Sequence, residues 1–189
     1  MSKLVFYFHG YGSSPESTKV ARLREELPDS EIHAFPINID PRVALPELCE
    51  RIESVLLDEP HSEDSVLFVG TSLGAWYAGT LANLYGLPSI LINPSCTPSV
   101  SLDRYDVPVS IREAYSDLVI PENAEVYLAE RDEVLNNEEL KASGSPIIVP
   151  GADHRFDGEP FSLVIKRIRE IMLDISQPWC YNGYVVLKG

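Results

Sequence analysis

The sequence predicts an α/β fold with a compact, mostly parallel sheet and helices on both faces, and three observations lead to it. Short apolar runs rich in β-branched and aromatic residues alternate with amphipathic helical segments along the chain, as in doubly covered parallel sheets. The 189 residues, 44% of them hydrophobic, suit one domain with a single core. One apolar run leads through a Gly-x-Ser-x-Gly pentapeptide into a helical segment, which is typical of a sharp strand-to-helix turn.

Six segments are expected to form strands, because each is a short apolar run bounded by turn residues. They are residues 4–8, 32–35, 66–69, 89–92, 125–128 and 147–149. Ser14 and Pro15 predict the start of the first helix, as N-cap and first helical residue, and Asp40 and Pro41 start a second helix in the same way. Residues 161–175 carry a wide apolar stripe at helical spacing, so this last helix should pack against the sheet.

Residues 1–176 are expected to form a single domain. Within it, residues 94–121 lose any regular period and follow a central strand, so we expect a small cap over the carboxyl ends of the strands. In the tail, residues 177–189, two short aromatic-rich runs flank Asn182-Gly183, a strong hairpin signal. Such short strands must dock on the domain or on a second copy of the chain, which makes a homo-oligomer possible. The alternative is a disordered end.

The charge and the cysteines narrow the possible partners and the location. Fifteen basic and 29 acidic residues give a net charge of −14, which disfavours binding to nucleic acid and to membrane surfaces. Cys49, Cys96 and Cys180 are odd in number and far apart, which argues against a disulfide framework and a zinc site. No run approaches the length of a transmembrane helix. We therefore expect a cytoplasmic protein.

Ser72 is the candidate nucleophile, because Gly70 and Gly74 flank it as a nucleophile elbow requires. The same five residues could also form a Gly-flanked turn with a solvated serine. A serine hydroxyl needs a base and an orienting carboxylate, and in this architecture the partners follow in the order serine, acid, histidine. His154 is the one histidine that comes after Ser72, and it follows the last expected strand.

The acid is expected in the loop after residues 125–128, where Glu130, Asp132 and Glu133 are available. We assign Asp132. It could equally be the N-cap of a following helix, a role that would look the same in sequence.

Acyl transfer also needs two donors for the oxyanion, and the backbone N–H groups of Leu73 and Tyr11 are the expected pair. His9 is expected to hydrogen-bond within its own loop. Cys96 is expected to be a buried small side chain and not a second nucleophile. The aromatic side chains expected to line the site are Trp76, Tyr11 and Tyr115.

Taken together, these motifs resemble those of small α/β-hydrolases, in particular the YqiA/YcfP-like bacterial esterases. The matching segments span most of the chain and are residues 8–15, 70–74, 93–94, 132–135 and 151–156. The resemblance implies an α/β-hydrolase fold and a serine esterase of short acyl esters, with Ser72 as nucleophile, His154 as base and Asp132 as acid. Arg131 stands where that family usually has Gly, and the aromatic tail is not a feature of it.

The resulting hypothesis is a metal-free and cofactor-free serine esterase whose partner is a small acyl ester. The short cap and limited length favour short acyl chains. A thioesterase or deacylase with the same triad is the alternative among enzymes. A non-catalytic binding protein on the same fold is the alternative outside them.

Overall fold

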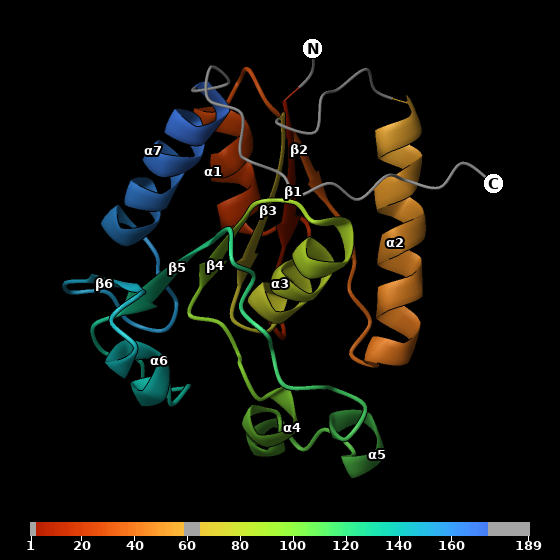
Figure 1. The fold of residues 1–189 in the computed structure, drawn as a ribbon, viewed down its shortest axis with the longest axis vertical. Helices are drawn as coiled ribbons and strands as arrows, with labels where there is room; N and C mark the ends of the chain where they lie inside the picture. The colour runs from red at the N-terminus through yellow and green to blue at the C-terminus, as the bar shows by residue number, and fades with distance from the viewer. Residues whose placement is uncertain (1–2, 59–64, 174–189) are drawn as a thin grey trace.

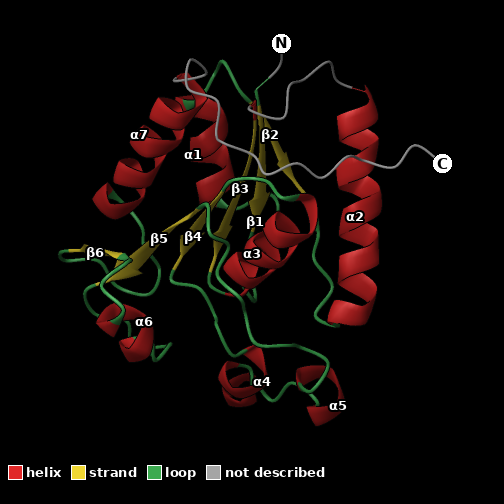
Figure 2. Ribbon diagram, in the orientation of Figure 1, coloured by secondary structure: helices red, strands yellow, loops and turns green. Residues whose placement is uncertain are grey.

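The computed structural model describes residues 3–58 and 65–173, and in this part six strands form one sheet (Figures 1 and 2). Every pair of neighbouring strands is parallel, in the order β2-β1-β3-β4-β5-β6. The strands are β1 Leu4–Phe8, β2 Glu31–Ala34, β3 Val66–Thr71, β4 Ser89–Ile92, β5 Ala124–Ala129 and β6 Ile147–Val149. The predicted parallel sheet is therefore confirmed, with all six strands near their expected positions.

Helices cover both faces of this sheet. In Figure 1, α1 and α7 lie on one side of it, and α2 and α3 lie on the other. The helices are α1 Thr18–Glu26, α2 Pro41–Asp58, α3 Leu73–Tyr85, α4 Pro98–Ser101, α5 Val109–Arg112, α6 Glu138–Ala142 and α7 Glu159–Leu173, with a 3₁₀ turn, η2, at Asp103–Tyr105.

Two cores follow from the alternation of side chains along the strands. In β1, Leu4, Phe6 and Phe8 point to the core beneath α2 and α3, while Val5 and Tyr7 point to the core beneath α1 and α7. All five side chains are buried, so β1 has no solvent-facing side. The predicted stripe of the last helix packs into the second core with Phe161, Val164, Ile165, Ile168 and Met172.

The start of the first helix differs from the prediction by three residues. α1 begins at Thr18 with Ser17 as its N-cap residue. Ser14 instead forms a turn before the helix: its carbonyl accepts the Ser17 N–H at 3.2 Å, and its hydroxyl accepts the Glu16 N–H at 3.2 Å. The Ser-Pro signal therefore marks a turn, because local side-chain bonds compete with helix formation. The second helix, α2, does begin at its predicted proline.

Residues 94–121 carry α4, η2 and α5 and lie beyond the carboxyl ends of the strands (Figure 1). Whether this segment acts as a cap stays a prediction. The expected hairpin at residues 177–189 lies outside the described residues. Within residues 3–58 and 65–173, no helix has the length and apolar character needed to cross a membrane.

The turn from β3 into α3 depends on two glycines at which the backbone is crowded. A Cβ on Gly70 would overlap backbone atoms of Gly74 and Ala75, and a Cβ on Gly74 would overlap the carbonyl of Phe8. Backbone atoms cannot move aside as the end of a flexible side chain can. The Gly-x-Ser-x-Gly spacing is therefore a steric requirement of this turn, as the sequence predicts.

We expect Gly74→Ala to lower the free energy of unfolding by about 1–3 kcal/mol or more, because the added methyl group forces the turn away from β1. Urea denaturation of the purified variant measures this. Gly79→Ala is the matched control, since in the same helix the three atoms nearest to the added methyl group belong to the side chains of Leu118, Leu91 and Pro121. Equal losses in the two variants would contradict the steric role of Gly74.

Candidate active site

Ser72 occupies the turn between β3 and α3 in an unusual backbone conformation, with φ of 57° and ψ of −120°. Positive φ is costly for a residue with a Cβ, so the surroundings must hold it. Its N–H donates to the carbonyl of Ile92 at 2.9 Å, and its own carbonyl accepts the N–H of Ser95 at 3.1 Å. These bonds fix the serine above the carboxyl ends of β3 and β4.

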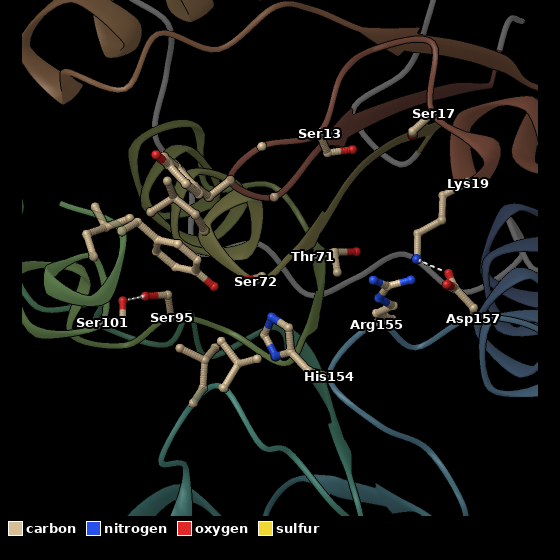
Figure 3. Close-up of a pocket in the computed structure, with 18 of the residues that line it drawn as sticks. Ser13, Ser17, Lys19, Thr71, Ser72, Ser95, Ser101, His154, Arg155 and Asp157 are labelled. Carbon is tan, nitrogen blue, oxygen red and sulfur yellow. Dashed lines mark hydrogen bonds and ion pairs between the residues drawn. The ribbon is translucent and has the colours of Figure 1, made fainter. Parts of the chain in front are cut away.

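The Ser72 side chain faces a cavity of about 600 Å³ (Figure 3). The loop after β1, the segment between β4 and β5, and the loops after β5 and β6 all contribute to its walls. His154 lines the same cavity, in the loop after β6. The volume lies in the range of small-molecule sites, which is about 300–1,000 Å³.

Asp132 and His154 form a direct pair behind this cavity. His154 Nδ1 lies 2.9 Å from both carboxylate oxygens of Asp132. The Asp132 side chain is 2% exposed, and the carboxylate also accepts the backbone N–H groups of Val134 and Leu135 at 2.9 and 2.8 Å. Burial alone would raise the pKa of Asp132, but the bonds from His154, Leu135 and Val134 outweigh it and hold the pKa below its usual value. The pair thus consists of an ionised carboxylate and an imidazole oriented through Nδ1.

The two other acids of this loop, Glu130 and Glu133, bind backbone N–H groups of the loop that carries His154. The His154 imidazole is hydrogen-bonded to Asp132. Glu130 accepts the N–H of Gly151 at 3.0 Å, and Glu133 accepts the backbone N–H of His154 at 3.4 Å. The helix that follows begins only at Glu138, so Asp132 caps the turn before α6 and does not cap the helix itself. The alternative of a helix N-cap is therefore wrong: the Asp132 carboxylate contacts His154 and caps a turn.

Among the described residues, no hydrogen bond joins Ser72 Oγ to His154. Catalytic hydrogen bonds of this kind are often long until a substrate binds. The structure places both side chains on one cavity, with His154 held from behind by Asp132.

Tyr11 and Leu73 line the same cavity, and the backbone N–H of neither donates to another described residue. Leu73 is the first residue of α3, so its N–H has no intrahelical acceptor. A Cβ on Gly10 would lie 3.9 Å from Ser72 Oγ, which shows how closely the loop after β1 approaches the serine. The Tyr11 ring packs on Tyr105, with 4.7 Å between the ring centroids.

His9 is confirmed as a residue that bonds within its loop. Its Nδ1 and the carbonyl of Gly10 are hydrogen-bonded at 3.0 Å, and burial lowers the pKa of His9 below its usual value. Cys96 lies outside the Ser72 cavity and is half-buried, where the sequence predicted a buried side chain. Its partial burial together with the charge of Asp117 raises the pKa of its thiol to about 11. At neutral pH this thiol stays protonated, so it is a weak nucleophile.

Two of the three aromatic residues expected to line the site do not do so. Trp76 and Tyr115 pack on each other in the core, with 4.8 Å between their rings, and are 1% and 5% exposed. Trp76 Nε1 donates to the carbonyl of Ser116 at 2.8 Å. Tyr115 belongs to the 94–121 segment and buries its ring against Trp76 of α3, which favours packing over exposure in a cavity. Tyr11 does line the cavity.

Residues 4–113 match the model of a family described as "Uncharacterised protein family (UPF0227)". The chain belongs to this family. A UPF0227 protein of Shewanella woodyi is 25% identical over 178 residues, which cover 93% of this chain and 89% of that protein. A UPF0227 protein of Shewanella baltica is 29% identical over 119 residues, which cover 61% of this chain and 62% of that protein.

Solved structures similar to this UPF0227 chain have the α/β-hydrolase fold. Est1E from Butyrivibrio proteoclasticus with ferulic acid bound has a TM-score of 0.69 at 16% identity, covering 92% of this chain and 90% of Est1E. The fluorophosphonate-binding serine hydrolase FphF of Staphylococcus aureus has a TM-score of 0.66 at 11% identity, covering 90% of this chain and 84% of FphF. Mouse alpha/beta hydrolase domain-containing protein 10 has a TM-score of 0.64 at 15% identity, covering 93% of this chain and 91% of the mouse protein. The expected fold and the resemblance to YqiA/YcfP-like proteins are thereby confirmed.

Asn93 is a residue of the site to which the sequence assigns no role. It follows β4 with φ of 43° and is fully buried. Its side-chain amide donates to the carbonyl of His154 at 3.1 Å and of Asp153 at 3.4 Å, while its Oδ1 accepts the N–H of Ala129 at 2.7 Å. Asn93 therefore joins the end of β5 to the loop that carries His154. A polar residue directly after a buried strand and before a proline was the available signal.

Within the described ranges, no group of three or more His, Cys, Asp and Glu side chains is placed to hold an ion.

We expect Asn93→Ala to lower the free energy of unfolding by about 1–3 kcal/mol for each buried partner that it leaves unpaired. Asn93→Gly separates the loss of the side-chain hydrogen bonds from backbone strain, because glycine adopts the positive φ without strain but cannot make those bonds. Chemical denaturation of both variants measures the loss. A glycine variant as stable as the wild type would show that the bonds to Ala129 and His154 contribute nothing.

Proposed function

We propose that this protein is a serine esterase that hydrolyses short acyl esters. The observation that carries the proposal is the hydrogen bond from His154 Nδ1 to the buried Asp132 carboxylate, on the cavity that Ser72 also lines. This bond leaves Nε2 as the nitrogen available for proton transfer.

In the proposed reaction, Ser72 Oγ attacks the ester carbonyl carbon as its proton passes to Nε2 of His154. The tetrahedral intermediate collapses to an acyl-enzyme, and the alcohol leaves with the proton from His154. Water then attacks the acyl-enzyme with His154 again as base, which releases the carboxylic acid and restores Ser72. Asp132 remains ionised and stabilises the imidazolium in both steps.

The oxyanion of each intermediate is assigned to the backbone N–H groups of Tyr11 and Leu73. Both line the cavity beside Ser72, and both lack another acceptor among the described residues. Preorganised donors of this kind contribute about 3–4 kcal/mol each in related reactions. Leu73 also places the N-terminus of α3 behind the developing charge.

The size and lining of the cavity support a short acyl group. One wall of the cavity has an apolar surface, formed by Leu102, Tyr105, Val134 and Leu135. A volume of about 600 Å³ accommodates a short acyl group without a separate tunnel for a long chain. FphF, which shares the fold, is a fluorophosphonate-binding serine hydrolase by description, which makes a fluorophosphonate a suitable probe here.

We expect the wild type to react with a fluorophosphonate probe and to hydrolyse short 4-nitrophenyl esters, and Ser72→Ala to do neither. Ser95→Ala is the matched control, since its hydroxyl borders the same cavity but is bonded to Ser101 Oγ at 2.6 Å. Labelling of intact protein followed by mass spectrometry measures the first result, and release of 4-nitrophenolate the second. A wild type that neither labels nor exceeds Ser72→Ala on any ester sinks the proposal.

We expect Asp132→Asn to lower kcat by about four orders of magnitude, by analogy with the same change in triad proteases, since the amide no longer holds His154 in the required tautomer. The low pKa of Asp132 keeps its carboxylate ionised throughout the neutral range, so its own titration should not limit the rate there. Steady-state kinetics of Asp132→Asn beside Glu133→Gln measures the effect. A variant at position 132 with nearly wild-type kcat would assign the acid to another carboxylate.

A further inference from the structure

The cavity extends beyond Ser72 and His154 into a region that the proposed chemistry does not use. We call this region the polar arm and define it by Ser13, Ser17, Lys19, Arg155 and Asp157, all of which line the cavity. In Figure 3 the hydroxyl groups of the two serines, the Lys19 ammonium and the Arg155 guanidinium lie around one space on the side of His154 that faces away from residues 94–121.

The polar arm has one positive charge that no acid compensates. Lys19 is paired with Asp157 across the arm. The exposed guanidinium of Arg155 makes no hydrogen bond or ion pair with any described residue. Glu133 also lines the cavity, outside the polar arm, and accepts the backbone N–H of His154 at 3.4 Å. Over the whole cavity the two basic side chains, Lys19 and Arg155, are therefore matched in number by two carboxylates. Within the polar arm itself, two basic side chains face one carboxylate, in a chain whose net charge is −14.

The polar arm also has an unused hydroxyl group. Ser17 Oγ is buried and has no hydrogen-bond partner among the described residues. It is the N-cap residue of α1, yet its side chain makes no capping bond to the helix. A buried hydroxyl without a partner costs about 1–3 kcal/mol, so a group that enters the arm and accepts its hydrogen bond would recover that loss.

We infer that the polar arm binds an anionic oxygen group, a carboxylate or a phosphate, that belongs to the substrate. The site would then act on esters that carry such a group on one side of the scissile bond. The guanidinium offers two parallel N–H donors to the anion, Lys19 adds a second cation beside Asp157, and Ser17 adds a hydroxyl donor. This inference rests on the proposed esterase function, because it names the substrate class of the same site.

The test compares esters that differ in charge and little in shape. One pair is 3-acetoxybenzoate and 3-acetoxybenzamide, with the charge on the alcohol side. The other is the mono-4-nitrophenyl ester of adipic acid and its methyl ester, with the charge on the acyl side. Each enzymatic kcat/KM is divided by the rate of hydroxide hydrolysis of the same ester, which removes differences in intrinsic reactivity.

We expect the anionic member of at least one pair to be preferred by about tenfold or more, as a charge-assisted hydrogen bond provides. The preference should fall as salt is raised, because Arg155 is exposed to solvent. Arg155→Gln should remove most of it. Arg24→Gln is the matched control, since this exposed arginine lies in the last turn of α1 and does not line the cavity, and it should keep the preference.

A binding measurement separates this inference from the proposed function. Calorimetry of Ser72→Ala with 3-acetoxybenzoate, 3-acetoxybenzamide and inorganic phosphate needs no turnover, and the two anions should bind more tightly than the amide. If the wild-type side chain binds phosphate and Arg155→Gln does not, phosphate groups belong to the anions that the polar arm binds. If the wild type hydrolyses the neutral esters but shows neither preference nor tighter binding of either anion, the inference fails and the esterase proposal stands. If anions bind through Arg155 but no ester is hydrolysed, the esterase proposal fails and the anion site stands.

Discussion

The close backbone contact between the end of β1 and the start of α3 is the constraint on which the rest of the site depends. The Phe8 carbonyl lies so near Gly74 that no side chain fits between them, and Gly70 is closed in by the same turn. The chain can pass from β3 into α3 in so small a space only with Ser72 at positive φ. The contact also brings Gly10 against Ser72, so one steric requirement positions both the hydroxyl group and the amides beside it.

The order of the strands places the other groups. β3, β4 and β5 are neighbours in the sheet, so the residues that follow them, Ser72, Asn93 and Asp132, stand side by side at one edge. β6 is the next strand, and the loop after it carries His154. The Asn93 side chain then ties that loop to the sheet by bonding to its carbonyls and to the backbone of β5. The Asp132–His154 pair is thus a consequence of the sheet topology, and side-chain hydrogen bonds refine it.

The sequence was sufficient for the sheet and for the expectation that Ser72, Asp132 and His154 lie at one end of it, because both depend on strong local patterns. In a small domain, apolar runs of this length usually form buried strands. Residues that directly follow parallel strands lie together at the carboxyl end of the sheet. Side-chain contacts across the fold could not be read in this way. Trp76 and Tyr115 pack together in the core, although either could have lined a cavity. Ser14 misled for a local reason, because a turn and a helix N-cap favour the same residues. Asn93 is ordinary in sequence, and its two sets of bonds exist only once β5 and the loop after β6 are in place.

The walls of the cavity also differ in a way that would orient an ester. Ser72 and His154 lie between the polar arm and the segment of residues 94–121 (Figure 3). The polar arm carries the charged side chains Lys19, Arg155 and Asp157, whereas Leu102 and Tyr105 give the other side apolar surface, beside Ser95 and Ser101, whose hydroxyl groups are bonded to each other. An ester whose charged end lay on the apolar side would lose hydration without gaining a partner, which is costly for an ion. With the anion against Arg155 instead, the uncharged end lies against the apolar wall, and the carbonyl is left between them, next to Ser72. The long-range field of a chain with a net charge of −14 repels such a substrate, so its selection has to come from contacts within the cavity, where distances are short and screening is weaker.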